Sequence, residues 1–529
     1  MNNNTNKRKH QDENIELEDD NDDIYKSAKL SHSDIVELVN QVENDEFEEL
    51  NSNSLKKLVL SFENKYLKNQ QLRSKFKDDH SKYLESEMDL DESIKNLQVL
   101  ATTPDLYSVF VQLGTVVSLG SLLTHPNIFI VASVIDLLYE LLQHQEEESD
   151  QKMSLYQSMI ENGIVEALVQ TLSKLEVTEE DELKAIVNVY NCVETLLDLN
   201  SEQVARVLTT CQYPFISYLV SIVTSQESEL KMKLHASELL SIILQSNQVS
   251  HDLFGTKLEG IEKVLVVLSK TIKTPPVALE EKEFYENLIQ SLCSVLLTNN
   301  TNKQLFIKSE GTQLMLLFIK KKTIFRGSAL KLLNFSISNH KDSNENFVQV
   351  LGLKTLFTCF MKKLKKSSEK KKIYSEFQDD EHIITIIFSL LTQLNKDSDS
   401  MNRLLFKFTE NDFEKLVRLL ELHEKYYIRV QMLDRKIQHE QQQKDEEEDD
   451  EDLIYLKRLE GGLFTLQYID LIMLLLSYIN TQIKQKLLDL FKSKNFKISS
   501  IKAVISDYLE NNSSSITTYD ISQLLEKTF

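Results

Sequence analysis

Acidic and amide side chains interrupt three apolar helical segments of this chain. ASVIDLLYELL carries Asp136 and Glu140, NCVETLLDL carries Asn191 and Glu194, and HASELLSIIL carries Glu238. Because bare carboxylates favour water over a protein core, we expect these side chains on a solvated face of each helix. Such a face could pair with Lys or Arg side chains of a basic ligand. It could equally be an ordinary helix surface, and the residues alone leave both interpretations open.

The sequence lacks the short motifs by which many catalytic sites are recognised. It contains no glycine-rich phosphate loop, no C-x-x-C or H-x-x-x-H spacing and no G-x-S-x-G turn. The 11 histidines are scattered, and none pairs in sequence with a plausible nucleophile. We therefore expect no enzymatic activity, no metal site and no cofactor.

Apolar segments that flank a glycine recur along the chain. The first unit, Leu90–Leu142, contains three short helical patterns that are separated at Pro104, at Gly114 and at 125–127. Similar glycine-centred segments surround Gly163, Gly260, Gly311 and Gly352, and a copy without glycine lies near Cys211. The period of roughly 40 to 50 residues is typical of armadillo and HEAT repeats. Such units bury their apolar faces only against neighbours, and the resulting solenoids generally serve as binding surfaces.

Composition supports an all-helical chain. Only 10 Gly and 5 Pro occur in 529 residues, whereas average usage is about 7% and 5%. The predicted fold is an all-α, armadillo/HEAT-like right-handed α-solenoid with an N-terminal helical cap and an atypical C-terminal helical cap. We identify no run of about 18 apolar residues and no apolar N-terminal stretch, so we expect no membrane association and no signal peptide.

The cysteines indicate the redox environment. Widely separated thiols lie in apolar segments at Cys192, Cys211, Cys293 and Cys359. We expect buried free thiols in a protein of a reducing compartment.

The net charge of −22 is unevenly distributed. Acidic residues are concentrated in 1–54 and in the uninterrupted run 445–452, and such runs stay solvated. This balance makes direct RNA binding an unfavoured function, because phosphate neutralisation drives most nucleic-acid affinity. The lysine-rich segment 362–372 is the exception, and it could be a solvated loop or a site for RNA, phosphate or an import receptor.

These patterns divide the chain into four parts. We predict an acidic disordered arm over 1–54 and an N-terminal helical cap over 55–87. Armadillo-like repeats are expected over 88–395. A C-terminal helical region is expected over 396–529, with a long continuous helix over 411–443, an acidic loop at 445–452 and a kink near Gly461 and Gly462.

Segments inside and outside the repeats resemble one family. They are SFENKYLKNQQLRSKF at 61–76, MDLDESIKNLQVLATTPDLYSVFVQL at 88–113, EGTQLMLLFIKKK from 310, LLFKFTENDFEKLVRLLELHEKY at 404–426 and YLKRLEGGLFTLQYID at 455–470. The similarity extends over about 55–529. With these residues the chain is identified as similar to the β-catenin-like protein 1 family of nuclear armadillo proteins.

The resemblance implies a non-catalytic scaffold of the pre-mRNA splicing machinery. Its implied partners are the nineteen complex with its Myb-domain subunit, and basic nuclear-localisation-signal peptides of splicing factors. It also implies a homodimer and a nuclear location. Family members carry a basic import signal near the N-terminus, and Lys7, Arg8 and Lys9 form the matching cluster here.

Two related functions are alternatives. A karyopherin-α-like import adaptor would carry repeated Trp and Asn residues on the third helix of each repeat, which lines the groove. This chain has no Trp, and Asp136 and Glu140 stand in the corresponding positions. A β-catenin-like signalling scaffold would have a basic groove for acidic ligands, whereas this groove is predicted to be acidic.

Overall fold

The computed structural model describes residues 50–143, 150–175, 179–212, 214–362, 376–441, 451–494, 496–512 and 520–528. Within these ranges all regular secondary structure is helical, as predicted. The chain divides into two compact units, Met1–Asn200 with Cys211–Tyr213 and Ser201–Thr210 with Pro214–Phe529. The import-signal cluster Lys7, Arg8 and Lys9 and nearly all of the lysine-rich segment lie outside the described residues.

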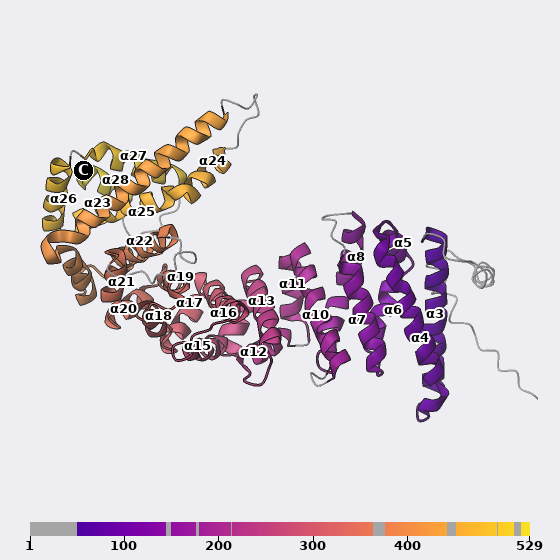
Figure 1. The fold of residues 1–529 in the computed structure, drawn as a ribbon. Coiled ribbons are helices and arrows are strands. Elements are labelled where there is room, and N and C mark those ends of the chain that lie inside the picture. The colour runs from indigo at the N-terminus through magenta and orange to yellow at the C-terminus, as the bar shows by residue number, and fades with distance from the viewer. Residues whose placement is uncertain are drawn as a thin grey trace, which may run out of the picture. The chain divides into compact units, whose positions relative to one another are not determined.

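The first unit contains eight α-helices and three short 3-10 turns, labelled η, among its described residues. They are α3 (Ser52–Lys75), η2 (His80–Lys82), α4 (Leu84–Asn96), η3 (Leu97–Thr102), η4 (Pro104–Leu106), α5 (Tyr107–Gln112), α6 (Thr115–Leu122), α7 (Ile128–Leu142), α8 (Asp150–Glu161), α9 (Ile164–Thr171) and α10 (Glu180–Leu199). Figure 1 shows them stacked side by side. Helices α5–α7 and α8–α10 are two successive triplets, and α3 packs against α4, α5 and α6 as a cap.

The second unit continues the triplets and ends in a longer helical region. Its triplets are α11 (Ser201–Thr210), α12 (Phe215–Thr224) and α13 (Leu230–Ser246); α14 (Val249–Asp252) with the π-helical turn η5 (Leu253–Lys257), α15 (Gly260–Lys270) and α16 (Leu279–Leu297); α17 (Asn300–Lys308), α18 (Gly311–Lys320) and α19 (Arg326–Ile337); and α20 (Lys341–Gln349), α21 (Gly352–Phe360) and α22 (Glu376–Gln393). The C-terminal region comprises α23 (Asp399–Gln441), α24 (Glu451–Arg458), η7 (Leu459–Leu463), α25 (Phe464–Ile479), α26 (Thr481–Ser493), α27 (Ile498–Asn511) and α28 (Ile521–Thr528).

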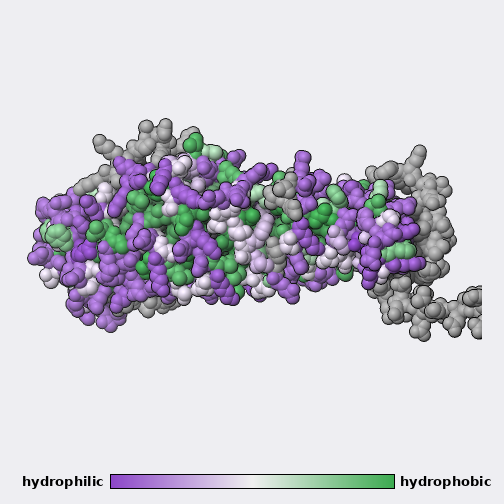
Figure 2. Space-filling model, turned by 90° about the horizontal axis from the view of Figure 1, so that it is seen from below, coloured by the Kyte–Doolittle hydropathy of each residue, from purple (hydrophilic) through white to green (hydrophobic). Residues whose placement is uncertain are grey.

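Equivalent helices of successive triplets pack on one another. In the first unit α4 contacts α7 and α7 contacts α10, while α5 contacts α8 and α6 contacts α9. In the second unit α13, α16, α19 and α22 form a continuous series of contacting third helices, and α25 follows α22. This stacking is that of an α-solenoid, so the predicted fold class is confirmed. Outside the core the surface seen in Figure 2 is mostly polar, with apolar patches between polar residues.

The glycines that mark the repeats act in two different ways. Gly114 itself adopts a left-handed conformation with φ 76° at the start of α6, as a glycine break predicts. At Gly311 the left-handed residue is instead the preceding Glu310, with φ 58°. A Cβ on Gly311 would lie 2.3 Å from the ring of the buried Phe306, so this glycine is required for close packing of α17 on α18.

Two predicted boundaries and the predicted burial of one cysteine differ from the structure. Helix α3 begins at Ser52, inside the predicted arm, because the side chain of Asn51 accepts hydrogen bonds from the amides of Asn53 and Ser54. Helix α24 begins at Glu451, so the last two residues of the predicted acidic loop are helical, and 445–450 lie outside the described residues. Cys211 is partly exposed at the α11–α12 turn, whereas the other three thiols are buried as predicted.

The predicted continuous helix over 411–443 is also wrong at its start. Helix α23 runs from Asp399 to Gln441 and is interrupted at 410–413, where Asn411, Asp412 and Phe413 have positive φ. Asn and Asp tolerate this conformation better than most residues. The buried ammonium of Lys415 lies 2.8 Å from Glu410 and 3.0 Å from Glu414, which holds the two ends of the break together.

Helix α25 is the core of the C-terminal region. It contacts α22, α23, α26, α27 and α28. Contrary to the prediction from the sequence, the helical stretch Asp452–Ile479 is long and apolar enough to cross a membrane. Most of its apolar part is buried inside the protein. The carboxylate of Asp470, fully buried in α25, lies 2.6 Å from Nδ1 of His423 on α23. Burial raises the pKa of Asp470 to about 6.

Candidate peptide-binding surface

The predicted acidic positions lie on the third helices, where polar side chains link one repeat to the next. On α7, the two oxygens of Asp136 each accept a hydrogen bond from α10. One donor is the ammonium of Lys184, the other is the side-chain amide of Asn188, and both distances are 2.7 Å. The Asp136 hydrogen bond raises the pKa of Lys184. The carboxylate predicted to bind a ligand's basic residue is therefore occupied by a lysine of the chain itself.

The same helix is linked to its other neighbour. The hydroxyl of Ser133 on α7 donates to Asp91 on α4 at 2.5 Å, and Lys95 lies 2.7 Å from the same carboxylate. Ser133 precedes Asp136 by nearly one turn, so both project from one side of α7. Helices α4, α7 and α10 thus present a connected row of polar groups.

The second unit has an equivalent row. Asn287 on α16 donates to Ser237 on α13 at 3.2 Å, and Ser328 on α19 donates to Glu286 on α16 at 2.6 Å.

Two basic side chains of α19 extend this row. Lys331 donates to Gln290 on α16 at 2.8 Å. Arg326 pairs with Asp379 on α22. We call these two series, one in each unit, the third-helix rows.

The partners in these rows are one repeat apart in the sequence. The paired residues are separated by 41 to 53 positions in both units. This separation is the repeat period itself, because equivalent positions of successive third helices lie next to each other in a solenoid. Polar residues within apolar helices were the available sequence signal, but their partners could not be read from the sequence.

The third-helix row of the second unit is not simply acidic, because burial favours the neutral forms of some of its titratable side chains. Burial raises the pKa of Glu286, although the hydrogen bond from Ser328 opposes that change. Burial, reinforced by Lys331, lowers the pKa of His382 on α22 to about 4. His382 is therefore neutral near pH 7 and can accept from the amide of Asn334 at 3.5 Å.

Four of the five predicted groove residues lie in the first unit, and the fifth lies in the second. Asp136 and the exposed Glu140 lie one turn apart on α7, and Asn191 and Glu194 lie on α10 of the same unit. Glu140 makes no hydrogen bond or ion pair with any described residue, although its charge helps to raise the pKa of Lys184, so its exposed carboxylate is open to a ligand. Glu238 lies on α13, in the second unit.

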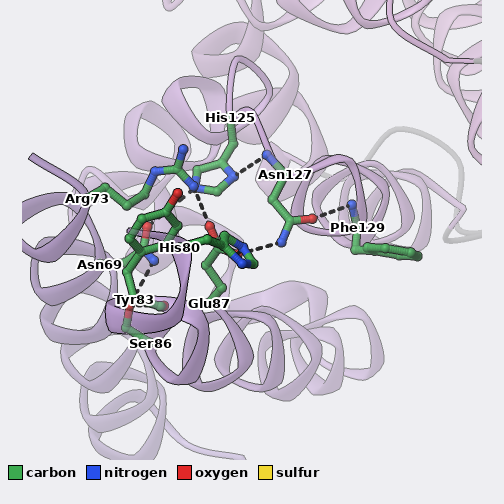
Figure 3. A network of polar contacts seen from close by, with 9 residues as sticks. All are labelled: Asn69, Arg73, His80, Tyr83, Ser86, Glu87, His125, Asn127 and Phe129. Carbon is green, nitrogen blue, oxygen red and sulfur yellow. Dashed lines mark hydrogen bonds and ion pairs between the residues drawn. The ribbon is translucent and has the colours of Figure 1, made fainter. Parts of the chain in front are cut away.

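A second polar network, around Glu87, joins the cap to the first triplet. Figure 3 shows Arg73, His80 and Asn127 directed at the Glu87 carboxylate. Glu87 is 3% exposed and accepts from the Asn127 amide at 2.8 Å. The Arg73 guanidinium also lies 4.9 Å from the centre of the Tyr83 ring. These contacts connect α3, α4 and the start of α7, and a structural function accounts for all of them.

No cluster suited to a metal ion occurs among the described residues. The buried His423–Asp470 pair has no nucleophilic side chain among the polar partners that the structure describes for it. Among the described residues, the third-helix rows of polar and charged side chains are therefore the surfaces suited to binding a charged peptide.

Comparison with known proteins identifies the family. A family model described as "Catenin-beta-like, Arm-motif containing nuclear" matches residues 33–506. Beta-catenin-like protein 1 of Homo sapiens is 37% identical over 474 residues, covering 87% of this chain and 82% of that protein. The Bos taurus protein of the same name has equal identity and coverage. Beta-catenin-like protein 1 homolog of Schizosaccharomyces pombe is 29% identical over 489 residues, covering 91% of this chain and 83% of that one.

The resemblance found in the sequence is confirmed by these matches, and the helix triplets agree with the armadillo motif in the family's description. The chain belongs to the catenin-β-like family of nuclear, armadillo-motif-containing proteins.

Proposed function

We propose that this protein is a non-catalytic nuclear scaffold of the pre-mRNA splicing machinery that binds basic, nuclear-localisation-signal-like segments of splicing factors. The partners proposed are subunits of the nineteen complex, including its Myb-domain subunit, and the protein acts as a homodimer. Membership of a nuclear armadillo family supports the scaffold function. The peptide-binding part rests on one observation, the pairing of Lys184 with Asp136.

This pair supports the proposal because it reproduces, within the chain, the contact that a ligand would make. Lys184 reaches from the neighbouring repeat and is 66% exposed, so it can swing away from Asp136 into water. A lysine or arginine of a bound segment would take its place on Asp136. Glu140 lies one turn further along α7 and has no hydrogen bond or ion pair with a described residue, so it would hold a second basic residue.

Peptide binding to the full-length protein tests this proposal. The probe is a fluorescein-labelled peptide with clusters of Lys and Arg, and the readout is fluorescence anisotropy at low salt, where charged contacts are least screened. We expect Asp136→Asn with Glu140→Gln to weaken binding several-fold, and Glu238→Gln to weaken it further. The matched control is Glu202→Gln, since Glu202 also pairs with a basic residue of the chain, Arg206 at 2.6 Å, but lies on a first helix. Equal affinity of the wild type and the triple variant would refute the groove.

Nuclear entry and partners need separate experiments. A reporter fused to 1–30 should enter the nucleus, and substitution of Lys7, Arg8 and Lys9 by alanine should keep it in the cytoplasm. Affinity purification of the tagged protein from nuclease-treated nuclear extract should recover splicing subunits, and these should be lost at high salt. Recovery of importin-β without splicing factors would favour an import adaptor instead.

A further inference from the structure

A groove in the C-terminal region combines exposed apolar side chains with basic ones. It lies beside the second half of α23, near the start of α22 and the η7 turn, and encloses about 520 Å³. Figure 1 shows this part of α23 running alongside α24. The groove lies entirely within the second unit. We call it the basic apolar groove and define it by Phe377, Ile428 and Met432 with Lys425, Arg429 and Lys436.

The apolar residues of the groove are unusually exposed for their size. Phe377 is 41% exposed, Ile428 51% and Met432 60%. Ile428 and Met432 are four residues apart and so lie on one face of α23. On the opposite side of the same helix, Tyr426 and Val430 are buried in the core. Exposed apolar side chains gathered beside a cavity indicate a binding surface.

The groove wall is held in place by contacts within the protein. The Arg429 guanidinium lies 3.8 Å from the centre of the Phe377 ring, and its Nε donates to the carbonyl oxygen of Gly461 at 2.6 Å. Phe377 also packs edge-on against Tyr426. The cation–π contact and the hydrogen bond both favour this one arrangement of the Arg429 side chain. Phe377 and Arg429 therefore present a fixed apolar and basic edge before any partner binds.

The charge of the groove is opposite to that of the protein. Lys425 is neutralised by Asp380 at 2.7 Å. Arg429 and Lys436 have no carboxylate partner among the described residues, and none of the described residues that line the groove is acidic. This local positive charge lies in a chain whose net charge is −22. The ligand that fits such a site carries carboxylates next to apolar side chains.

We propose that the basic apolar groove binds an acidic amphipathic helix of a partner protein. Apolar residues at helical spacing in the partner would pack on Phe377, Ile428 and Met432, as helices do in apolar grooves. Glu or Asp residues beside them would pair with Arg429 and Lys436. This inference does not depend on the proposed function, since it involves another surface and a ligand of opposite charge.

The test uses a synthetic helical peptide with Leu at i, i+3, i+4 and i+7 and Glu on both flanks, and a second peptide with Lys in place of Glu. Both are labelled and titrated with the full-length protein. We expect the Glu peptide to bind and the Lys peptide not to bind at this site. Met432→Ser with Lys436→Glu should weaken Glu-peptide binding about tenfold or more, because a few anchor residues carry most of the free energy of binding.

The matched control is Phe406→Ser. Phe406 is 62% exposed, lies on the same helix and lines a different cavity, so its replacement should leave Glu-peptide binding unchanged. Circular dichroism checks that all variants retain their helical content. Absence of Glu-peptide binding, equal binding by the Met432 and Lys436 double variant, or a preference for the Lys peptide would each overturn the proposal. So would displacement of the bound Glu peptide by single-stranded RNA, which would assign the groove to nucleic acid.

Discussion

The ammonium of Lys184 and the carboxylate of Asp136 lie 2.7 Å apart, on third helices of consecutive repeats. Asp136 lies on α7 and Lys184 on α10, and the two charges come together only because these helices stack on one another. The pair both links α7 to α10 and occupies the position where a basic ligand residue is proposed to bind. Lys184 should therefore contribute to stability and at the same time compete with a basic ligand for Asp136.

Replacing Lys184 by methionine should strengthen the binding of a basic peptide. The substitution keeps much of the apolar stem but removes the internal competitor for Asp136. Since an exposed ion pair contributes about 0.2 to 1 kcal/mol, the gain in affinity should be about 1.4- to fivefold, with a comparably small loss of stability. Anisotropy titration with the Lys- and Arg-rich peptide measures the gain. Weaker binding by Lys184→Met would show that the ligand does not replace this lysine.

Glu63 should make the stability of the protein depend on pH. Burial raises the pKa of this carboxyl to about 7, opposed by a hydrogen bond from Ser118. Because the folded state then holds a proton that the unfolded state releases, the free energy of unfolding should fall as pH rises from about 4.5 to 7. Glu63→Gln removes this titrating group. The free energy of unfolding of the variant, relative to the wild type, should therefore be higher at pH 8 than at pH 5, by on the order of 1 kcal/mol.

Urea unfolding of the wild type and Glu63→Gln at both pH values checks this. Glu85→Gln, at an exposed position on α4, serves as the control and should show no such pH-dependent difference. A Glu63→Gln effect that is the same at pH 5 and pH 8 would contradict the predicted shift.

Removing the Glu87 carboxylate should destabilise the junction between the cap and the first triplet. In Glu87→Ala the guanidinium of Arg73 and the side-chain amide of Asn127 lose the carboxylate that accepts their hydrogen bonds. Loss of one partner of a buried pair costs about 3 to 5 kcal/mol. Hydrogen exchange should show faster opening of α3 and α4, and Asp89→Ala, which removes only a more exposed ion pair with Lys68, should have a small effect. Unchanged exchange in α3 would contradict this account of the network.

The repeat glycines should respond differently to the same substitution. Gly114→Asn should cost little, because Asn tolerates a positive φ and a Cβ there meets nothing within 4 Å. Gly311→Asn should cost about 1 to 3 kcal/mol, because the new side chain collides with the Phe306 ring. Thermal unfolding of the two variants measures the difference, and equal losses would show that both glycines serve the same purpose.

The sequence by itself determined the local features of this protein. Apolar periodicity, helix caps and glycine breaks depend on residues a few positions apart, so the triplets and their period can be predicted from the sequence alone. The charge distribution and the motifs shared with the family could be read directly as well. The copy without glycine near Cys211 was also located correctly, since α11 and α12 meet there at Pro214.

Tertiary structure decided what depends on residues a full repeat apart. Lys184 reaches Asp136 over 48 positions, and His423 reaches Asp470 over 47. No local pattern encodes such a pairing, because it follows from how neighbouring helices stack. The same stacking makes Gly311 necessary for packing and buries most of the apolar part of Asp452–Ile479 inside the protein. It also leaves Phe377, Ile428 and Met432 open beside Arg429, a surface that local apolar periodicity could not distinguish from a buried one.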